Sequence, residues 1–262
     1  NGQAHSGFGS GSGYTDPSTW GVGTPGAAPG TPTRVSAPMT IDSVVQKTAI
    51  SLGVVIIAAL ATWIMTPSVD LGISPSLGTA VAIGSLGAFA LSMVNSFKRV
   101  ISPALVIAFC ALEGVALGAW SKMLDAAYGG NIISGAVIGT FAAFAGTLAA
   151  YKFFNIKVGQ KFRTFVIAAM FGMVGLGLME LVLSLFSADL GLFGISGLGM
   201  LTAFAGLALG IFMLVMDFDF VEQGIRNQLD ERESWRAAFA MTVSLVWIYT
   251  NLVRILAFFS DN

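Results

Sequence analysis

The sequence has few charged residues, and that scarcity limits what the protein can be. Charged residues make up 10% of the 262 residues and hydrophobic residues 55%, whereas globular proteins carry roughly 25% charged residues. This composition is typical of a membrane protein. The formal net charge is −1 and no segment forms a basic domain. Because nothing in the chain would neutralise a phosphate backbone, we exclude nucleic acid as a partner.

Cysteine and histidine are nearly absent as well. The single cysteine, Cys110, excludes an intrachain disulfide, and the single histidine, His5, excludes metal sites built from several histidines. With no histidine in the apolar body, Ser/His and Cys/His catalytic arrangements are excluded there too. We therefore expect no enzymatic activity and no resident cofactor. We interpret Cys110 as a small buried apolar residue.

The first 38 residues form a Gly/Ser/Pro/Thr-rich tract with few aliphatic side chains. Such a tract cannot bury enough apolar area to offset the loss of backbone entropy on folding. It also lacks the apolar segment behind a basic start that marks a signal peptide. We predict a disordered cytoplasmic tail over 1–38 and a transmembrane domain over 39–262, with a first span that inserts uncleaved.

Seven apolar runs follow, each close to the length of about 20 residues that a helix needs to cross ~30 Å of hydrocarbon. The runs are uninterrupted, whereas strands of a β-barrel would alternate apolar and polar residues. We predict an all-α polytopic membrane protein, a seven-transmembrane-helix bundle. The predicted spans are 46–66, 76–95, 102–121, 131–151, 164–187, 193–216 and 236–259.

The distribution of lysine and arginine predicts the orientation. One set of loops and the segment before the first span carry nearly all the basic residues, and the opposite loops carry only Lys122. We therefore place the N-terminus in the cytoplasm and the protein in the cell (inner) membrane. The basic residues on the predicted cytoplasmic side are Arg34, Lys47, Lys98, Arg99, Lys152, Lys157, Lys161, Arg163, Arg226, Arg232 and Arg236.

Small residues four positions apart predict how the helices pack. The segments GVALG, GAVIG and GLALG place glycines at 114 and 118, 135 and 139, and 206 and 210. Such pairs let helix backbones approach closely in lipid. We expect these contacts within one bundle, in preference to a homodimer face.

Two carboxylates, Glu113 and Glu180, lie within the predicted spans, and a third, Asp217, directly follows the sixth span. A charged side chain at membrane depth costs about 2.5–3.5 kcal/mol on insertion scales, so such groups normally face protein or water and are functional by default. Glu113 is near mid-membrane, Glu180 is nearer the outer side, and Asp217 ends its span on the cytoplasmic side. For Glu113 and Glu180, a hydrogen-bonded structural role remains the alternative.

Asp219 and Glu222 follow Asp217 closely. Asp217 and Asp219, two residues apart on a helix, cannot face the same side, whereas Asp219 and Glu222 share a face. We interpret that second pair as a solvated helix end. Withdrawing a carboxylic acid from water favours its neutral form, and a nearby cation favours its charged form.

Buried acids need counter-charges. The candidates are Lys98 and Arg99 at the start of the third span and Arg254 in the seventh. For Arg254 a second interpretation, snorkelling to the membrane interface, remains open.

Several ordered motifs resemble the transmembrane Bax-inhibitor-motif family, in its bacterial YccA-like branch. They are SPALVIAFCALEGVALGAW, TFAAFAGTLAAYK, DFDFVEQGIRNQ and TVSLVWIYTNLVRIL, and the resemblance covers about residues 39–259. It implies a seven-helix fold with a partly aqueous cavity, and a pH-sensitive calcium leak in which two aspartates share a proton. The first of these aspartates matches Asp217. Aligning the family's arginine with Arg254 places Ser244 at the second, a departure from the family pattern.

The leading hypothesis is therefore a cation channel with Ca²⁺ as the permeant ion and protons as regulators. Asp217, Asp219 and Arg254 are the predicted pH-sensing and gating residues. Glu113, Glu180 and Asp217 are the predicted pore or ion-binding residues and would hold Ca²⁺ only weakly and transiently. Any of Glu113, Glu180 and Asp219 could replace the missing second acid.

Two other functions compete with this hypothesis. The first is a non-conducting regulator that binds a membrane protease or another membrane protein, as the resemblance implies, through the tail or the charged segment 222–236. The second is an aspartyl intramembrane protease, although the chain lacks the GxGD string of that class. Two carboxylates within hydrogen-bond distance, beside an opening large enough for a substrate, would favour the protease.

Overall fold

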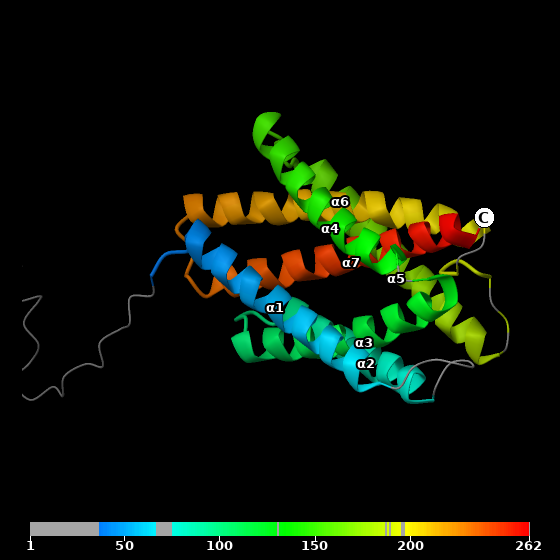
Figure 1. Ribbon diagram of the computed structural model, residues 1–262. Coiled ribbons are helices and arrows are strands. Elements are labelled where there is room, and N and C mark those ends of the chain that lie inside the picture. The colour runs from blue at the N-terminus through cyan, green and yellow to red at the C-terminus, as the bar shows by residue number, and fades with distance from the viewer. Residues whose placement is uncertain are drawn as a thin grey trace, which may run out of the picture. The chain divides into compact units, whose positions relative to one another are not determined.

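The computed structural model describes residues 37–66, 75–129, 131–186, 188, 190–194 and 197–261. Over these residues the chain forms seven helices, and each contains an apolar stretch long enough to cross a membrane (Figure 1). The predicted all-α, seven-helix fold is confirmed. The helices are α1 Ile41–Met65, α2 Pro75–Phe97, α3 Pro103–Tyr128, α4 Asn131–Phe153, α5 Gln160–Leu185, α6 Gly197–Arg226 and α7 Glu233–Asp261.

The helix bounds differ from the predicted spans mainly at the ends. The sixth span was predicted to start at residue 193, but Leu192–Gly194 form a bend and α6 begins at Gly197. At its other end α6 continues to Arg226, ten residues beyond the predicted limit, and it reaches 30 residues in all. A hydrophobicity criterion ends a span at the first acids, whereas the backbone hydrogen bonds of a helix continue past them.

The start of the membrane domain is tied to the connection between α6 and α7. The predicted boundary lay after residue 38, but Ala37 and Pro38 already pair with this connection: Glu231 N–H donates to the Ala37 carbonyl (2.8 Å), and Met39 N–H donates to that of Leu229 (2.7 Å). The predicted tail is otherwise outside the described residues.

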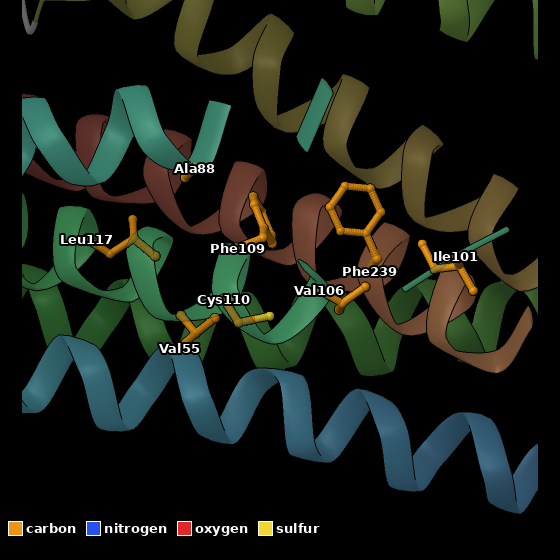
Figure 2. Close-up of a cluster of buried hydrophobic side chains, with 8 residues drawn as sticks. All are labelled: Val55, Ala88, Ile101, Val106, Phe109, Cys110, Leu117 and Phe239. Carbon is orange, nitrogen blue, oxygen red and sulfur yellow. The ribbon is translucent and has the colours of Figure 1, made fainter. Parts of the chain in front are cut away.

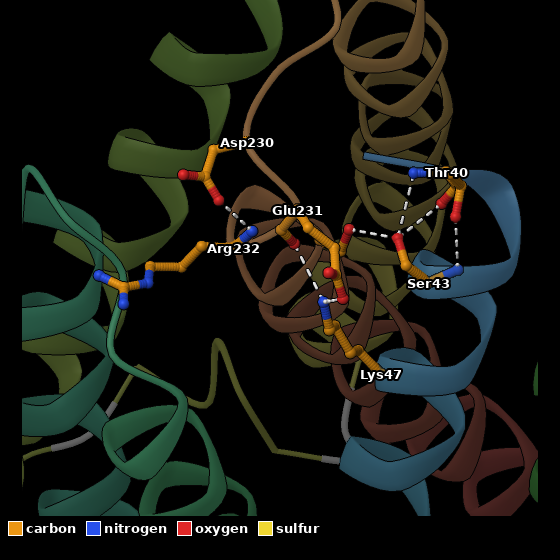
Figure 3. Close-up of polar contacts among 7 residues, drawn as sticks. Thr40, Ser43, Lys47, Asp230, Glu231 and Arg232 are labelled. Atoms are coloured by element: carbon orange, nitrogen blue, oxygen red, sulfur yellow. Dashed lines mark hydrogen bonds and ion pairs between the residues drawn. The ribbon is translucent and has the colours of Figure 1, made fainter. Parts of the chain in front are cut away.

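Helix α1 starts where Thr40 and Ser43 form a reciprocal capping box, which satisfies N–H groups that have no partner within the helix (Figure 3). One turn later, Lys47 Nζ donates to the Glu231 carboxylate (2.8 Å) and to its backbone carbonyl (3.0 Å). The Ser43 and Ser234 hydroxyls are 2.7 Å apart. Part of the charged segment 222–236 is therefore used inside the chain.

Helix α7 is the central helix of the bundle. It packs against α1, α3, α4 and α6 (Figure 1). Half of its most apolar 18-residue stretch is buried, compared with 6% for α5, whose close backbone contacts among the described helices are with α6. One core cluster joins α7 to α1, α2 and α3, and the ring of Phe109 meets that of Phe239 edge-on at 5.1 Å (Figure 2).

The glycine pairs lie where helices cross, as predicted. A Cβ atom at Gly114 would lie 2.5 Å from the Val55 carbonyl oxygen of α1. Gly139 faces Leu252 and Gly210 faces Ile248, both on α7. All three glycine segments therefore pack within the chain.

Candidate functional site

Asp217 and Ser244 meet between α6 and α7. The two helices are antiparallel neighbours, and Gly206 and Gly210 let them approach closely before the chain reaches Asp217. Ser244 Oγ donates a hydrogen bond to Asp217 Oδ2 at 2.5 Å. Asp217 is 9% exposed and Ser244 is 1% exposed, so both are withdrawn from solvent. The structure thus places Ser244 opposite the acid, at the position where the family resemblance expects a second aspartate.

Asp219 lies on a different side of α6 from Asp217, as the two-residue spacing predicts, but it is not solvated. Its Oδ2 accepts hydrogen bonds from Arg163 of α5 (2.8 Å) and from Gln223 (2.7 Å). The residue is 8% exposed, so the solvated helix end predicted for Asp219 is wrong. Arg163 covers it from the start of α5. Glu222 is exposed and binds Arg226 and Tyr151.

A polar cavity of about 430 Å³ adjoins this group, beside the connection between α4 and α5. Acids and bases both line it, among them Tyr151, Lys157, Asp219, Glu222 and Arg226. Its lining carries both signs of charge, so it selects neither cations nor anions by sign alone.

Glu113 lies on the face of α3 that meets α7, one helical turn beyond Phe109 and two turns before Ser121. Phe109 contacts Phe239 of α7. Glu113 itself is partly exposed, and no hydrogen bond to it is found within the residues that the structure describes.

Glu180 and Arg254 hold the same residue of the connection between α5 and α6. Glu180 Oε1 accepts from the Leu192 N–H at 3.1 Å, and Arg254 Nη2 donates to the Leu192 carbonyl at 3.0 Å. The same Nη2 reaches the Gly199 carbonyl (2.7 Å) and Thr202 Oγ1 (2.9 Å). Arg254 is only 7% exposed, so its guanidinium is enclosed by protein and not by solvent. Its guanidinium binds backbone oxygens and forms no ion pair with an acid of the described chain.

The predicted ion-binding carboxylates do not form one site. Arg254 binds Thr202, and the helical rise places Asp217 about 22 Å along α6 from Thr202, so Glu180 and Asp217 lie at different depths. Phe109, one turn before Glu113, contacts Phe239 of α7, and Phe239 lies about 140° around that helix from Ser244, which faces Asp217. Within the described ranges, no group of three acidic, cysteine or histidine residues could hold a metal ion. The structure therefore does not bring Glu113, Glu180 and Asp217 together as one metal site, and their separate roles in cation binding stay predictions.

None of the predicted counter-charges forms an ion pair with Asp217 in the described chain. Lys98 and Arg99 are exposed at the end of α2, and neither forms an ion pair with a described carboxylate. Arg254 lies ten residues beyond Ser244 on α7, about 15 Å along the helix. Asp217 therefore depends on a hydroxyl, not on a cation.

Sequence reasoning missed two partnerships. Arg163 was treated as a loop residue that sets the orientation, but it pairs with Asp219, 56 positions away. Leu192 and Gly199 were assigned no role, yet their carbonyls bind Arg254. No pattern of residue types marks a backbone carbonyl as a ligand. The odd placement of an arginine within an apolar run was the only available signal.

Comparison with known proteins is consistent with this architecture. A family model described as Bax inhibitor 1 like matches residues 3–261, almost the entire chain. The chain belongs to the Bax inhibitor 1 like family. The resemblance expected over 39–259 is confirmed, and the match to the Bax inhibitor 1 like model is longer because it includes most of the Gly-rich N-terminal segment. No curated protein matches the chain. Family membership and the seven apolar helices identify a multi-pass membrane protein.

Proposed function

We propose that this protein is a pH-sensitive cation leak channel with Ca²⁺ as a permeant ion, and that the protonation state of Asp217 controls its opening. The proposed location is the inner membrane, with a cytoplasmic N-terminus. The observation that carries the proposal is the buried contact between Asp217 and Ser244, which joins α6 to the central helix α7. Acidic groups within a membrane attract permeating cations, and conduction requires that they bind weakly.

The neutral partner of Asp217 has a consequence for pH sensing. A pair of neighbouring carboxylic acids titrates in two coupled steps, because two like charges cannot easily coexist. Ser244 remains uncharged, so Asp217 has no second carboxyl group with which to share a proton. We expect the flux to follow a single protonation step.

The charges near Asp217 suggest the order in which a permeating cation would meet these residues. Asp219 and Glu222 continue along α6 toward the polar cavity, and Arg163 and Arg226 offset their charge. In the proposed path, cations pass this mixed cavity and then meet Asp217. Glu113 and Glu180 lie elsewhere in the bundle, so they are not required to act with Asp217.

The test is calcium and proton flux into liposomes that contain the purified full chain, measured over a series of pH values. We expect Asp217→Asn to abolish the pH dependence, because asparagine cannot ionise. Asp42→Asn, in the exposed first turn of α1, is the matched control and should keep the profile. An unchanged pH dependence in Asp217→Asn refutes the assignment.

Ser244 provides a second, sharper arm of the same experiment. Ser244→Ala should shift the midpoint of the profile while leaving one step. Ser244→Asp should produce two steps, because it places a second carboxyl group against Asp217.

The two alternative functions make different predictions. A non-conducting regulator would show no flux above empty liposomes and would co-purify with a membrane protease. An aspartyl protease would need two carboxylates in contact, and among the described residues Asp217 faces a serine and Asp219 an arginine. The proposal therefore assigns no catalytic residue.

A further inference from the structure

A second cavity, of about 220 Å³, lies between α1 and α4 and is unrelated to the acidic residues. Helices α1 and α4 both pack on α3 and α7, but they make no close backbone contact with each other in the described chain. The resulting gap has α3 and α7 as its floor. Leu117 of α3 and Val246 of α7 lie on this floor, and Ile56 of α1 and Val137 of α4 lie on the walls.

The lining is almost entirely apolar and offers water little to bind. No charged side chain lines the cavity, and its polar side chains include three hydroxyls that already have partners. Ser121 Oγ and Tyr249 Oη form a hydrogen bond of 2.7 Å, and Thr140 Oγ1 donates to the Ala136 carbonyl at 2.7 Å. A buried water needs two to four polar partners, so this cavity favours an apolar occupant.

The mouth of the cavity faces the hydrocarbon of the membrane. Its wall residues are also exposed on the outside of two spanning helices: Ile56 is 48% exposed and Leu60 is 56% exposed on α1, and Phe141 is 52% exposed on α4. The cavity is therefore continuous with the lipid-facing surface. The apolar groups that meet this surface at high concentration are the acyl chains of the bilayer.

We propose that the acyl chain of a membrane phospholipid occupies the cavity between α1 and α4 and reaches the floor formed by α3 and α7. The hydrophobic effect does not drive this binding, because the acyl chain moves from one apolar environment, the bilayer, to another, the cavity. The driving force is instead the dispersion attraction between the acyl chain and the atoms that line the void it fills. The headgroup stays at the interface, because no charged side chain lines the cavity.

The bound acyl chain packs against α7 next to the contact between Asp217 and Ser244. Leu245 and Val246, which line the cavity, directly follow Ser244, whose hydroxyl binds Asp217. The lipid site itself does not depend on ion conduction, so it is tested separately.

The test uses the full chain in phosphatidylcholine vesicles that contain a phosphatidylcholine with a photoactivatable diazirine in its acyl chain. After illumination, labelled peptides are mapped by mass spectrometry. We expect labels on the floor, at 117–121 and 245–249, and we expect floor labelling to saturate as the fraction of labelled lipid rises. Labels at ordinary lipid-facing positions such as Phe171, which is 69% exposed, should rise in proportion.

A matched pair of variants on α4 separates the cavity from the surface. Val137→Trp places a large ring at the mouth, and we expect floor labelling to fall about tenfold. Ile138→Trp adds the same ring one residue later, at a position that is 69% exposed and outside the cavity, and should leave floor labelling unchanged.

Three results would overturn the proposal. They are floor labelling that never saturates in the wild-type chain, floor labelling that survives in folded Val137→Trp, and labelling by a diazirine fatty acid but not by the phospholipid. The saturation measurement needs no variant, so it decides the question even when Val137→Trp does not fold.

Discussion

Replacing Arg254 with lysine tests whether the geometry of its guanidinium, and not only its charge, holds the connection between α5 and α6. One nitrogen, Nη2, lies within 3.0 Å of three oxygens, on Leu192, Gly199 and Thr202. Nη1 adds a longer bond to Asn251. A lysine ammonium also carries its donors on one nitrogen, but its stem is shorter, so it cannot reach the position of Nη2 and all these oxygens, and it has no second nitrogen for Asn251. Lysine nevertheless keeps the cost of burying a cation.

The expected magnitude follows from the bonds lost. Hydrogen bonds between helices in a membrane are worth about 0.6 kcal/mol on average and up to about 1.7 kcal/mol. If lysine keeps one of the three short bonds, the loss of the other two costs about 1–3 kcal/mol. For a chain of this size, that corresponds to a Tm lower by roughly 3–9 °C. Arg254→Met should be less harmful than Arg254→Lys, because methionine also removes the buried charge.

The single cysteine supplies the assay. Cys110 is fully buried on α3, so a thiol-reactive fluorophore reports its exposure as the protein unfolds in detergent. Arg226→Lys is the matched control, since Arg226 forms an exposed ion pair within one helix, and its Tm should change by about 1 °C or less. A wild-type Tm in Arg254→Lys, or a Tm below that of Arg254→Lys in Arg254→Met, would refute the reasoning.

Two further predictions concern packing and charge. Gly114→Val should destabilise the bundle by about 1–3 kcal/mol or more, because its Cβ would meet the backbone of Val55, whereas Gly146→Val, with open space around it, should be neutral within about 0.5 kcal/mol; thermal unfolding compares them. A double-mutant cycle of Arg163→Gln and Asp219→Asn should give a coupling of about 1 kcal/mol that weakens with added salt, since the arginine side chain is 38% exposed; no coupling would contradict the ion pair.

The sequence predicted the helices because length and apolarity alone decide which segments cross a membrane. It also predicted the place of Ser244, since Arg254 anchored the alignment with the family. It could not predict what Arg254 binds, because its partners are carbonyls of Leu192 and Gly199, and every residue carries a carbonyl. Their use depends on the path of the backbone between α5 and α6.

The separation of the predicted ion-binding acids has a simple physical cause. Glu180 was placed near the outer side and Asp217 at the cytoplasmic end, and a separation of that size along the membrane normal already argues against a common site. Residue type and burial showed which acids were costly, but not which face of α7 each would meet. Phe109, one turn before Glu113, and Asp217 contact different faces of that helix, and only the three-dimensional packing shows this.

The position of α7 has a consequence for biosynthesis. The helix that contacts α1, α3, α4 and α6 is the last of the seven to leave the ribosome. Until it inserts, the earlier helices lack the surface that they share, and Asp217 has no hydroxyl to bind. A chain that stalls before residue 233 would therefore present unpaired packing faces to the lipid and to the cell's quality-control proteases.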